Sequence, residues 1–178
     1  NSGSDNNLGL VPDTPVNSFG ASDYVAQMFP YNKVTIHVKG GETHVFGPYS
    51  GQSSVYKNGV TYKSYGTGQG TIDITNPGMF VLNRFQGNDL IFDNVSIYCD
   101  NEASRTIQNV LAYTGNDGKA SFVGCNLNFV GKCFLIGDFN STAYKWDIRL
   151  DGCTQTGSGG LNRNVPAGSN KIILDATI

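Results

Sequence analysis

Two aspartates are the residues whose type and spacing come closest to acid–base chemistry. Asp93 and Asp151 each end a short apolar stretch and precede an Asn or a Gly. If those stretches stack with one strand between them, the carboxylates lie roughly 9–10 Å apart, near the separation used by inverting glycosidases. Asp is also favoured before a tight turn for its geometry alone, and Val123 occupies the intervening stretch. No catalytic residue is therefore assigned.

A tyrosine-rich segment has the chemistry of a recognition surface. It surrounds Asn58-Gly59, and Asn-Gly between two alternating runs is typical of a two-residue β-hairpin. A tyrosine ring can stack on a sugar or a side chain while its hydroxyl donates a hydrogen bond. We predict ligand binding here, with packing on the fold as the alternative role of the tyrosines. The predicted binding residues are Tyr56, Lys57, Tyr62 and Tyr65.

The remaining candidates for catalysis or metal binding are few. The chain has two glutamates, Glu42 and Glu102, and two histidines, His37 and His44. Its four cysteines include no CxxC pair and none has a histidine at ligand spacing, so neither a metal site nor a cofactor is predicted.

Three stretches that could hold these side chains can be superimposed on one another: 89–97, 119–127 and 146–154. Asn94, Gly124 and Gly152 then share one position, 30 and 28 residues apart, and Val95, Cys125 and Cys153 share the next. Short strands recurring at such a period are typical of a solenoid. Gly and Asn tolerate the left-handed backbone that turns one strand into the next.

A second column keeps nearly the same period. Val81, Val110 and Leu135 lie in apolar runs 29 and 25 residues apart. We therefore predict parallel coils of about 25–30 residues; an antiparallel sandwich, whose strands also recur at short intervals, is the alternative. The residues expected to share one core are Leu90, Phe92, Phe122, Ile148 and Leu150.

The cysteines fit this scheme only in part. Cys125 and Cys153 should stack in adjacent coils, either as free thiols that pack as small hydrophobes or as a disulfide between coils. Cys99 and Cys133 lie near expected turns and receive no assignment.

The chain before the coils has a different pattern. Residues 22–29 combine a polar cap with apolar residues at helical spacing and end at Pro30, which predicts a short helix covering the end of the stack. Residues 34–39 alternate as a strand with Val34, Ile36 and Val38 inward. The predicted organisation is a flexible leader over 1–19 and a single domain over 20–178, comprising cap and first strands (20–54), hairpin (55–65) and coils (71–178).

Composition and charge exclude several classes of function. The 178 residues include 23 glycines, only 15% are charged, and the net charge is −2. Without a basic run, nucleic-acid binding is not expected. No stretch approaches the roughly 20 apolar residues that cross a bilayer, so membrane insertion is not expected.

The helix, the Val34–Gly41 strand and the irregular coils with Asn-Val and Gly-Cys corners together resemble the right-handed parallel β-helix of the pectin-lyase-like superfamily. The irregular coil length and the composition rich in Gly, Asn, Ser and Thr over residues 20–178 are most similar to those of bacteriophage tailspikes and virion fibres. The resemblance implies an all-β fold with a short N-terminal capping helix. The calcium-binding Asp cluster and Arg base of pectate lyases, and the Asn-Thr-Asp strand of polygalacturonases, are absent from the sequence.

Two classes of function follow as expectations from that resemblance. The first is a structural or receptor-binding virion protein (a tail spike, tail fibre or capsid-attached fibre). It would be extracellular as part of the virion, would form a homotrimer with other virion proteins as partners, and would contact a bacterial surface glycan. The alternative is a secreted polysaccharide-degrading enzyme or a fragment of one. The small number of acidic residues that could act in catalysis favours the virion protein.

Overall fold

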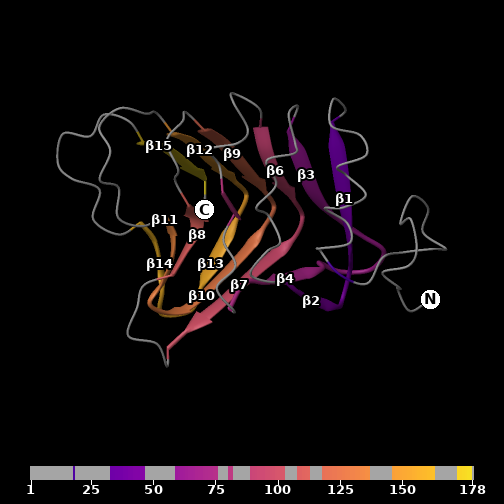
Figure 1. The fold of residues 1–178 in the computed structure, drawn as a ribbon, viewed down its shortest axis with the longest axis horizontal. Coiled ribbons are helices and arrows are strands. Elements are labelled where there is room, and N and C mark those ends of the chain that lie inside the picture. Colours follow the sequence, from indigo (N-terminus) through magenta and orange to yellow (C-terminus); the bar gives the residue numbers. More distant parts are fainter. Residues whose placement is uncertain are drawn as a thin grey trace.

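The structure is a computed structural model that describes residue 18 and residues 33–46, 59–75, 80–81, 89–102, 108–112, 118–136, 146–162 and 172–177. Within these ranges the regular elements are β-strands, and no helix is present (Figure 1). The predicted helix over 22–29 lies outside the described residues, as does the predicted leader except Ser18. The described part of the chain is therefore all-β.

The strands form three sheets in which neighbouring strands run parallel, as Figure 1 shows. Sheet A contains, in spatial order, β1 (Val34–Lys39), β3 (Val60–Tyr65), β6 (Asp89–Asp93), β9 (Gly118–Val123), β12 (Trp146–Asp151) and β15 (Ile172–Thr177). Sheet B contains β2 (Thr43–Val45), β4 (Thr71–Asp73), β7 (Ser96–Asn101), β10 (Asn126–Gly131) and β13 (Thr154–Thr156). Sheet C contains β5 (Phe80–Val81), β8 (Gln108–Ala112), β11 (Cys133–Ile136) and β14 (Gly160–Asn162).

Along the chain, β3 to β14 enter sheets A, B and C in turn. Paired residues on neighbouring strands are separated by 25 to 31 positions in the sequence. Thr71 and Ser96 are an example of the shortest separation, and Phe80 and Leu111 of the longest. Residues 89–93 pair parallel with 119–123, and 96–101 with 126–131. The parallel pairing predicted for these stretches is confirmed, and the antiparallel alternative is wrong for them.

The second predicted column is partly shifted. Val110 lies opposite Leu135, as expected, because Asn109 pairs with Phe134 and Leu111 with Ile136 on either side of it. Val81, however, pairs with Ala112 rather than with Val110.

The predicted hairpin around Asn58-Gly59 is also corrected. Gly59 has the positive φ expected of such a turn, 96°. However, Val60, Thr61 and Tyr62 pair with β1 on one side and with β6 on the other. Because both edges of this strand carry parallel neighbours, an antiparallel partner has no edge to pair with. Residues 50–58 lie outside the described residues.

The inward side chains of the three sheets form one apolar core. In sheet A, Ile36, Tyr62, Phe92, Phe122 and Leu150 lie in one register column and are buried. The three aromatic rings stack nearly parallel, with centroids 5.3 and 4.6 Å apart. All five predicted core residues are buried: Leu90, Phe92, Phe122, Ile148 and Leu150.

The predicted corner residues have the left-handed backbone that their types suggested. Asn94, Gly124 and Gly152 have φ values of 54°, 58° and 59°. The backbone ladder continues through the turn, because Asn94 N donates to Val123 O and Gly124 N donates to Asp151 O, each at 2.8 Å. The side chain of Gln69 links two of these corners: its Nε2 donates to Asn94 Oδ1 at 3.1 Å and to Gly124 O at 2.7 Å.

The four cysteines fall into two pairs of different kind. Cys125 and Cys153 are free and buried, so the free-thiol interpretation is confirmed. Cys99 and Cys133 form a disulfide with their Cα atoms 6.1 Å apart. This bond joins β7 of sheet B to β11 of sheet C, and the sequence had not indicated it.

Candidate functional site

The predicted tyrosine surface does not form as one patch. Tyr62 is 1% exposed and its ring stacks on Phe92 in the core, so it has no face to offer an external ligand. Tyr65 is half-buried on the opposite side of the same strand, with its ring edge-on to that of His37 at 6.2 Å. Positions three apart on a strand point to opposite faces. Tyr62 is therefore withdrawn as a binding residue, while Tyr56 and Lys57 lie outside the described residues.

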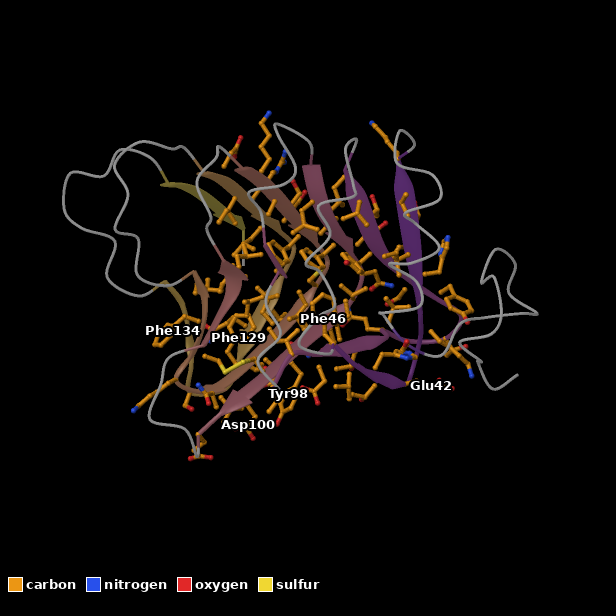
Figure 2. All side chains as sticks on the ribbon, viewed as in Figure 1. Glu42, Phe46, Tyr98, Asp100, Phe129 and Phe134 are labelled. Atoms are coloured by element: carbon orange, nitrogen blue, oxygen red, sulfur yellow. A yellow bond between two sulfur atoms is a disulfide. The ribbon has the colours of Figure 1, made fainter. Side chains whose placement is uncertain are left out.

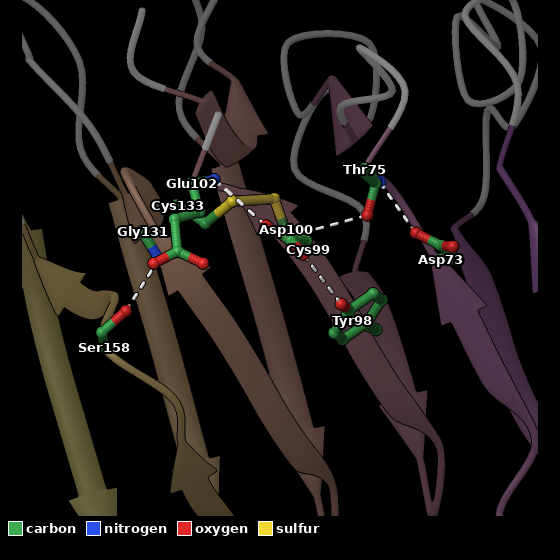
Figure 3. The surroundings of a disulfide bond; sticks show 9 residues. All are labelled: Asp73, Thr75, Tyr98, Cys99, Asp100, Glu102, Gly131, Cys133 and Ser158. Carbon is green, nitrogen blue, oxygen red and sulfur yellow. Dashed lines mark hydrogen bonds between the residues drawn. A yellow bond between two sulfur atoms is a disulfide. The ribbon is translucent and has the colours of Figure 1, made fainter. Parts of the chain in front are cut away.

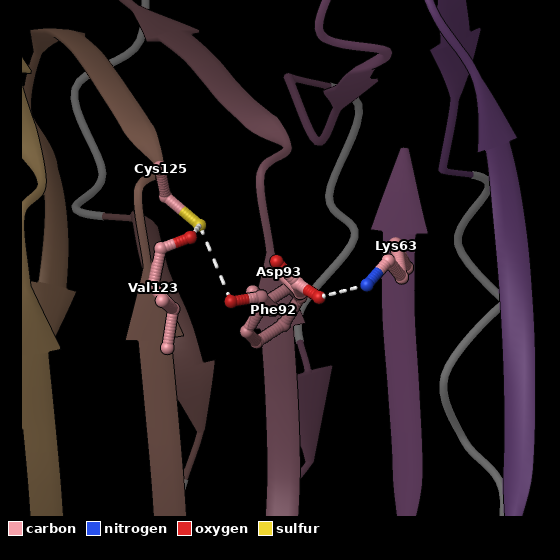
Figure 4. Close-up of polar contacts among 5 residues, drawn as sticks. All are labelled: Lys63, Phe92, Asp93, Val123 and Cys125. Carbon is pink, nitrogen blue, oxygen red and sulfur yellow. Dashed lines mark hydrogen bonds and ion pairs between the residues drawn. The ribbon is translucent and has the colours of Figure 1, made fainter. Parts of the chain in front are cut away.

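The two aspartates weighed for catalysis share the predicted column. Asp93 pairs with Val123, which pairs with Asp151. Lys63 Nζ lies 2.6 Å from Asp93 Oδ2 (Figure 4), and Arg149 lies 3.8 Å from Asp151 Oδ2. The Val123 side chain, 42% exposed, stands between the two carboxylates. Side chains on one face of a sheet project side by side rather than toward each other, so this geometry does not place two carboxylates across a substrate.

From β4 to β13, the outer face of sheet B is a polar surface that the sequence had not indicated, whereas the outward Val45 of β2 is apolar and exposed. Ile72, Ile97 and Leu127 point inward and are buried, so the residues that alternate with them point outward. These outward residues line up in two columns along the sheet. We call them the sheet B face: Thr71, Ser96, Asn126 and Thr154 in one column, Asp73, Tyr98, Asn128 and Thr156 in the other, and Asp100 at the end of β7.

Tyr98 is the aromatic residue of the sheet B face, and its hydroxyl is held in place. The hydroxyl donates to Asp100 Oδ2 at 3.2 Å (Figure 3). Asp100 Oδ1 accepts from the backbone N of Glu102 at 3.0 Å, and Asp73 Oδ1 accepts from that of Thr75 at 2.9 Å. Burial, the bond to Asp100 and the nearby carboxylates raise the pKa of the Tyr98 phenol, so it remains a donor.

The disulfide lies directly behind this group, as Figure 3 shows. Cys99 separates Tyr98 from Asp100 in the chain and is buried on the inner side of β7. At the end of the neighbouring strand β10, Gly131 N donates to Ser158 Oγ at 2.8 Å. The backbone that presents Tyr98 and Asp100 is thus tied to β11 by a covalent bond. Figure 2 draws the side chains as sticks, and in this view Tyr98 and Asp100 point away from the core.

Other kinds of site find no support in the part of the chain that is described. No group of three or more His, Cys, Asp or Glu residues there could hold a metal ion. The same residues contain no helix long and apolar enough to span a membrane. Comparisons of the chain with protein-family models, curated proteins and solved structures find no match.

The buried thiol of Cys125 makes stability depend on alkaline pH. Its Sγ donates to Phe92 O at 3.4 Å (Figure 4), and burial raises its pKa from the ordinary 9.0 to about 12. Between these values the unfolded chain releases the proton and the folded protein keeps it, so stability falls as pH rises. We expect this thiol to contribute a slope of up to about 1.4 kcal/mol per pH unit.

Urea unfolding at several pH values between 8 and 11 measures this slope. Cys125→Val is the matched variant, because Val95 occupies the equivalent position one coil earlier and is buried there. The variant should lose part of the alkaline decline in stability. An identical decline in both proteins would contradict the prediction.

Proposed function

We propose that sheets A, B and C are the faces of a right-handed parallel β-helix and that this chain is a receptor-binding virion protein. It would serve a bacteriophage as a tail spike, tail fibre or capsid-attached fibre and contact a glycan on the bacterial surface. The order in which β3 to β14 enter the three sheets supports the β-helix. The resemblance of the sequence to tailspikes, in its irregular coil length and its Gly/Asn/Ser/Thr-rich composition, supports the location on a virion.

The sheet B face is the observation that carries the binding function. Successive strands of a parallel sheet lie about 4.8 Å apart, so each column repeats hydroxyl, amide or carboxylate groups at short, regular intervals. Thr154 Oγ1 donates to Asn126 Oδ1 at 3.3 Å, which shows that neighbours in a column are close enough to share hydrogen bonds. A polysaccharide presents hydroxyl groups along its length and can be bound by such a surface at several points.

The disulfide supports a location outside the reducing cytosol. The Cys99–Cys133 bond joins two strands of the core and is fully buried. Stable structural disulfides occur mainly in oxidising settings, which include cell and virion surfaces. An extracellular place on the virion agrees with this bond.

Self-association completes the proposal. In sheet A the end strands β1 and β15 each have one neighbour among the described strands. Open edges and ends of a short stack are commonly covered by further protein. We propose a homotrimer with parallel axes that joins other virion proteins.

The alternative, a polysaccharide-degrading enzyme, has less support. Its candidates Asp93 and Asp151 each lie beside a cation on the outer face of sheet A, with Val123 between them.

The test combines binding, mass and product analysis on the whole chain. We expect the protein to bind at least one bacterial surface polysaccharide, to run as a trimer in light scattering, and to release no new reducing ends. Failure to bind any polysaccharide from a broad panel would refute the binding function, and a monomer at micromolar concentration would refute the trimer. Release of reducing ends that is abolished by Asp93→Asn would favour the enzyme.

A further inference from the structure

The sheet B face differs in charge from the rest of the described surface. Its strands β4, β7, β10 and β13 present two carboxylates at outward positions, Asp73 and Asp100, and no Lys, Arg or His. Just beyond these strands, Glu102 and Lys132 add one charge of each sign. The outward positions of sheet A, in contrast, carry charges of both signs: the cations Lys63, Lys119 and Arg149 lie among the carboxylates Asp93, Asp147 and Asp151. The sheet B face is therefore electrostatically complementary to a cationic ligand.

The two carboxylates flank the one aromatic ring of this face. Asp73 is the register neighbour of Tyr98 on β4, and Asp100 follows Tyr98 by two residues on the same side of β7. The hydrogen bond to Asp100 fixes the phenol, and the disulfide fixes the strand behind it. A ring held in this way loses little conformational freedom when a ligand stacks on it.

Hydrogen-bonding capacity remains on both sides of the ring. Among the residues that the structure describes, Oδ2 of Asp73 accepts no hydrogen bond, since its bond from Thr75 uses Oδ1. On the other side, Asn128 on β10 is the register neighbour of Tyr98 and is half-buried on the same face. A carboxylate and an amide thus border the ring on neighbouring strands.

We propose that this part of the sheet B face binds an amino-sugar unit of a bacterial surface polysaccharide, with the sugar ring on Tyr98 and the protonated amine between Asp73 and Asp100. Hydroxyl groups of the same unit reach Asn128. The inference rests on the glycan-binding function proposed above and names the class of glycan. The C–H face of a sugar ring packs on an aromatic ring, and two carboxylates favour an ammonium group over a neutral or acidic substituent.

Three probes of equal length and different charge test the inference: a chitosan oligosaccharide, its N-acetylated counterpart and an oligogalacturonate. Calorimetric titration of the whole protein at a mildly acidic pH, where the glucosamine amines are protonated, gives the three affinities. We expect the order chitosan, then the N-acetylated oligosaccharide, then the oligogalacturonate. Added salt should weaken the binding of chitosan more than that of the N-acetylated probe, because only the former is charged.

Two variants separate the electrostatic contribution from stacking. Asp73→Asn keeps the acceptor oxygen for Thr75 and removes the charge, so it should weaken chitosan binding about tenfold and leave the N-acetylated probe nearly unchanged. Tyr98→Ala should weaken both probes, whereas Tyr98→Phe keeps the ring and loses only the hydrogen bond to Asp100, so it should weaken both probes much less. Asp147→Asn is the charge-matched control, because Asp147 is exposed on β12 of sheet A.

Each outcome decides between specific alternatives. Equal losses in Asp73→Asn and Asp147→Asn would mean that only net charge matters, and a preference for the N-acetylated or acidic probe would mean that the amine is not recognised; both overturn this inference and leave the glycan-binding function standing. Stronger competition by a short oligolysine would indicate a protein partner and overturn it as well. If the protein binds other bacterial polysaccharides but none of the three probes, this inference alone fails; if it binds none at all, the proposed function fails too.

Discussion

Replacing Phe92 by alanine is expected to lower the free energy of unfolding by about 3–5 kcal/mol. Phe92 is fully buried and lies in the middle of the aromatic column, with ring centroids 5.3 Å from Tyr62 and 4.6 Å from Phe122. The variant loses the burial of the ring, both stacking contacts and close packing around the cavity. Because the ring stacks on a residue of each neighbouring strand, its loss interrupts the aromatic column between β3 and β9.

Urea unfolding followed by circular dichroism measures this effect. Phe92→Leu is the matched variant: it keeps an apolar side chain in the column and should cost substantially less. Val45→Ala, at a side chain that is 59% exposed, should change stability by no more than about 0.5 kcal/mol. A loss below about 1 kcal/mol in Phe92→Ala would show that the column contributes little.

Removal of the disulfide is expected to cost about 3–4 kcal/mol in the double variant Cys99→Ala/Cys133→Ala. The bond closes a loop between residues 34 positions apart, and its loss restores the conformational entropy of that loop to the unfolded chain. The variant should also bind the proposed glycan less tightly, since Tyr98 and Asp100 flank Cys99 on the opposite side of the strand.

Reductant provides the control for this variant. It should lower the unfolding midpoint of the wild type toward that of the double variant and leave the double variant unchanged. Because both cysteines are buried, reduction should occur mainly from the unfolded chain. A wild-type midpoint that is indifferent to reductant would contradict a stabilising role for this bond.

The corners and the core of sheet A could be predicted because local chemistry restricts them. A left-handed backbone at Asn94, Gly124 and Gly152 requires residue types that are visible in the sequence. Alternation of apolar and polar residues likewise identified inward side chains of the strand over 34–39, Ile36 and Val38 among them. The position of Val81 was wrong because residues 79–82 are all apolar, and a run without alternation does not fix its register.

The hairpin prediction was wrong for a different reason, and so was the grouping of Tyr62 with Tyr65 on one surface. Asn-Gly is a local signal, and the parallel neighbours that β1 and β6 supply to Val60–Tyr65 override it. Treating Tyr62 and Tyr65 as one surface ignored the alternation of the strand that holds them. The sheet B face depends on residues that are remote in sequence and meet only once the parallel strands pair, and the disulfide likewise joins two cysteines 34 residues apart.

The corner column also determines how a chain of this kind can change length. Segments 94–123 and 124–151 each begin at one corner and end just before the next. Their lengths differ by two residues, and the strands on both sides nevertheless keep their parallel pairing. Duplicating or deleting one such segment would add or remove one strand per sheet and leave every remaining alternation of faces intact. A single-residue insertion within a strand would instead exchange its inner and outer side chains. Recombination at these corners is therefore the route by which descendants of this gene can lengthen or shorten while still folding.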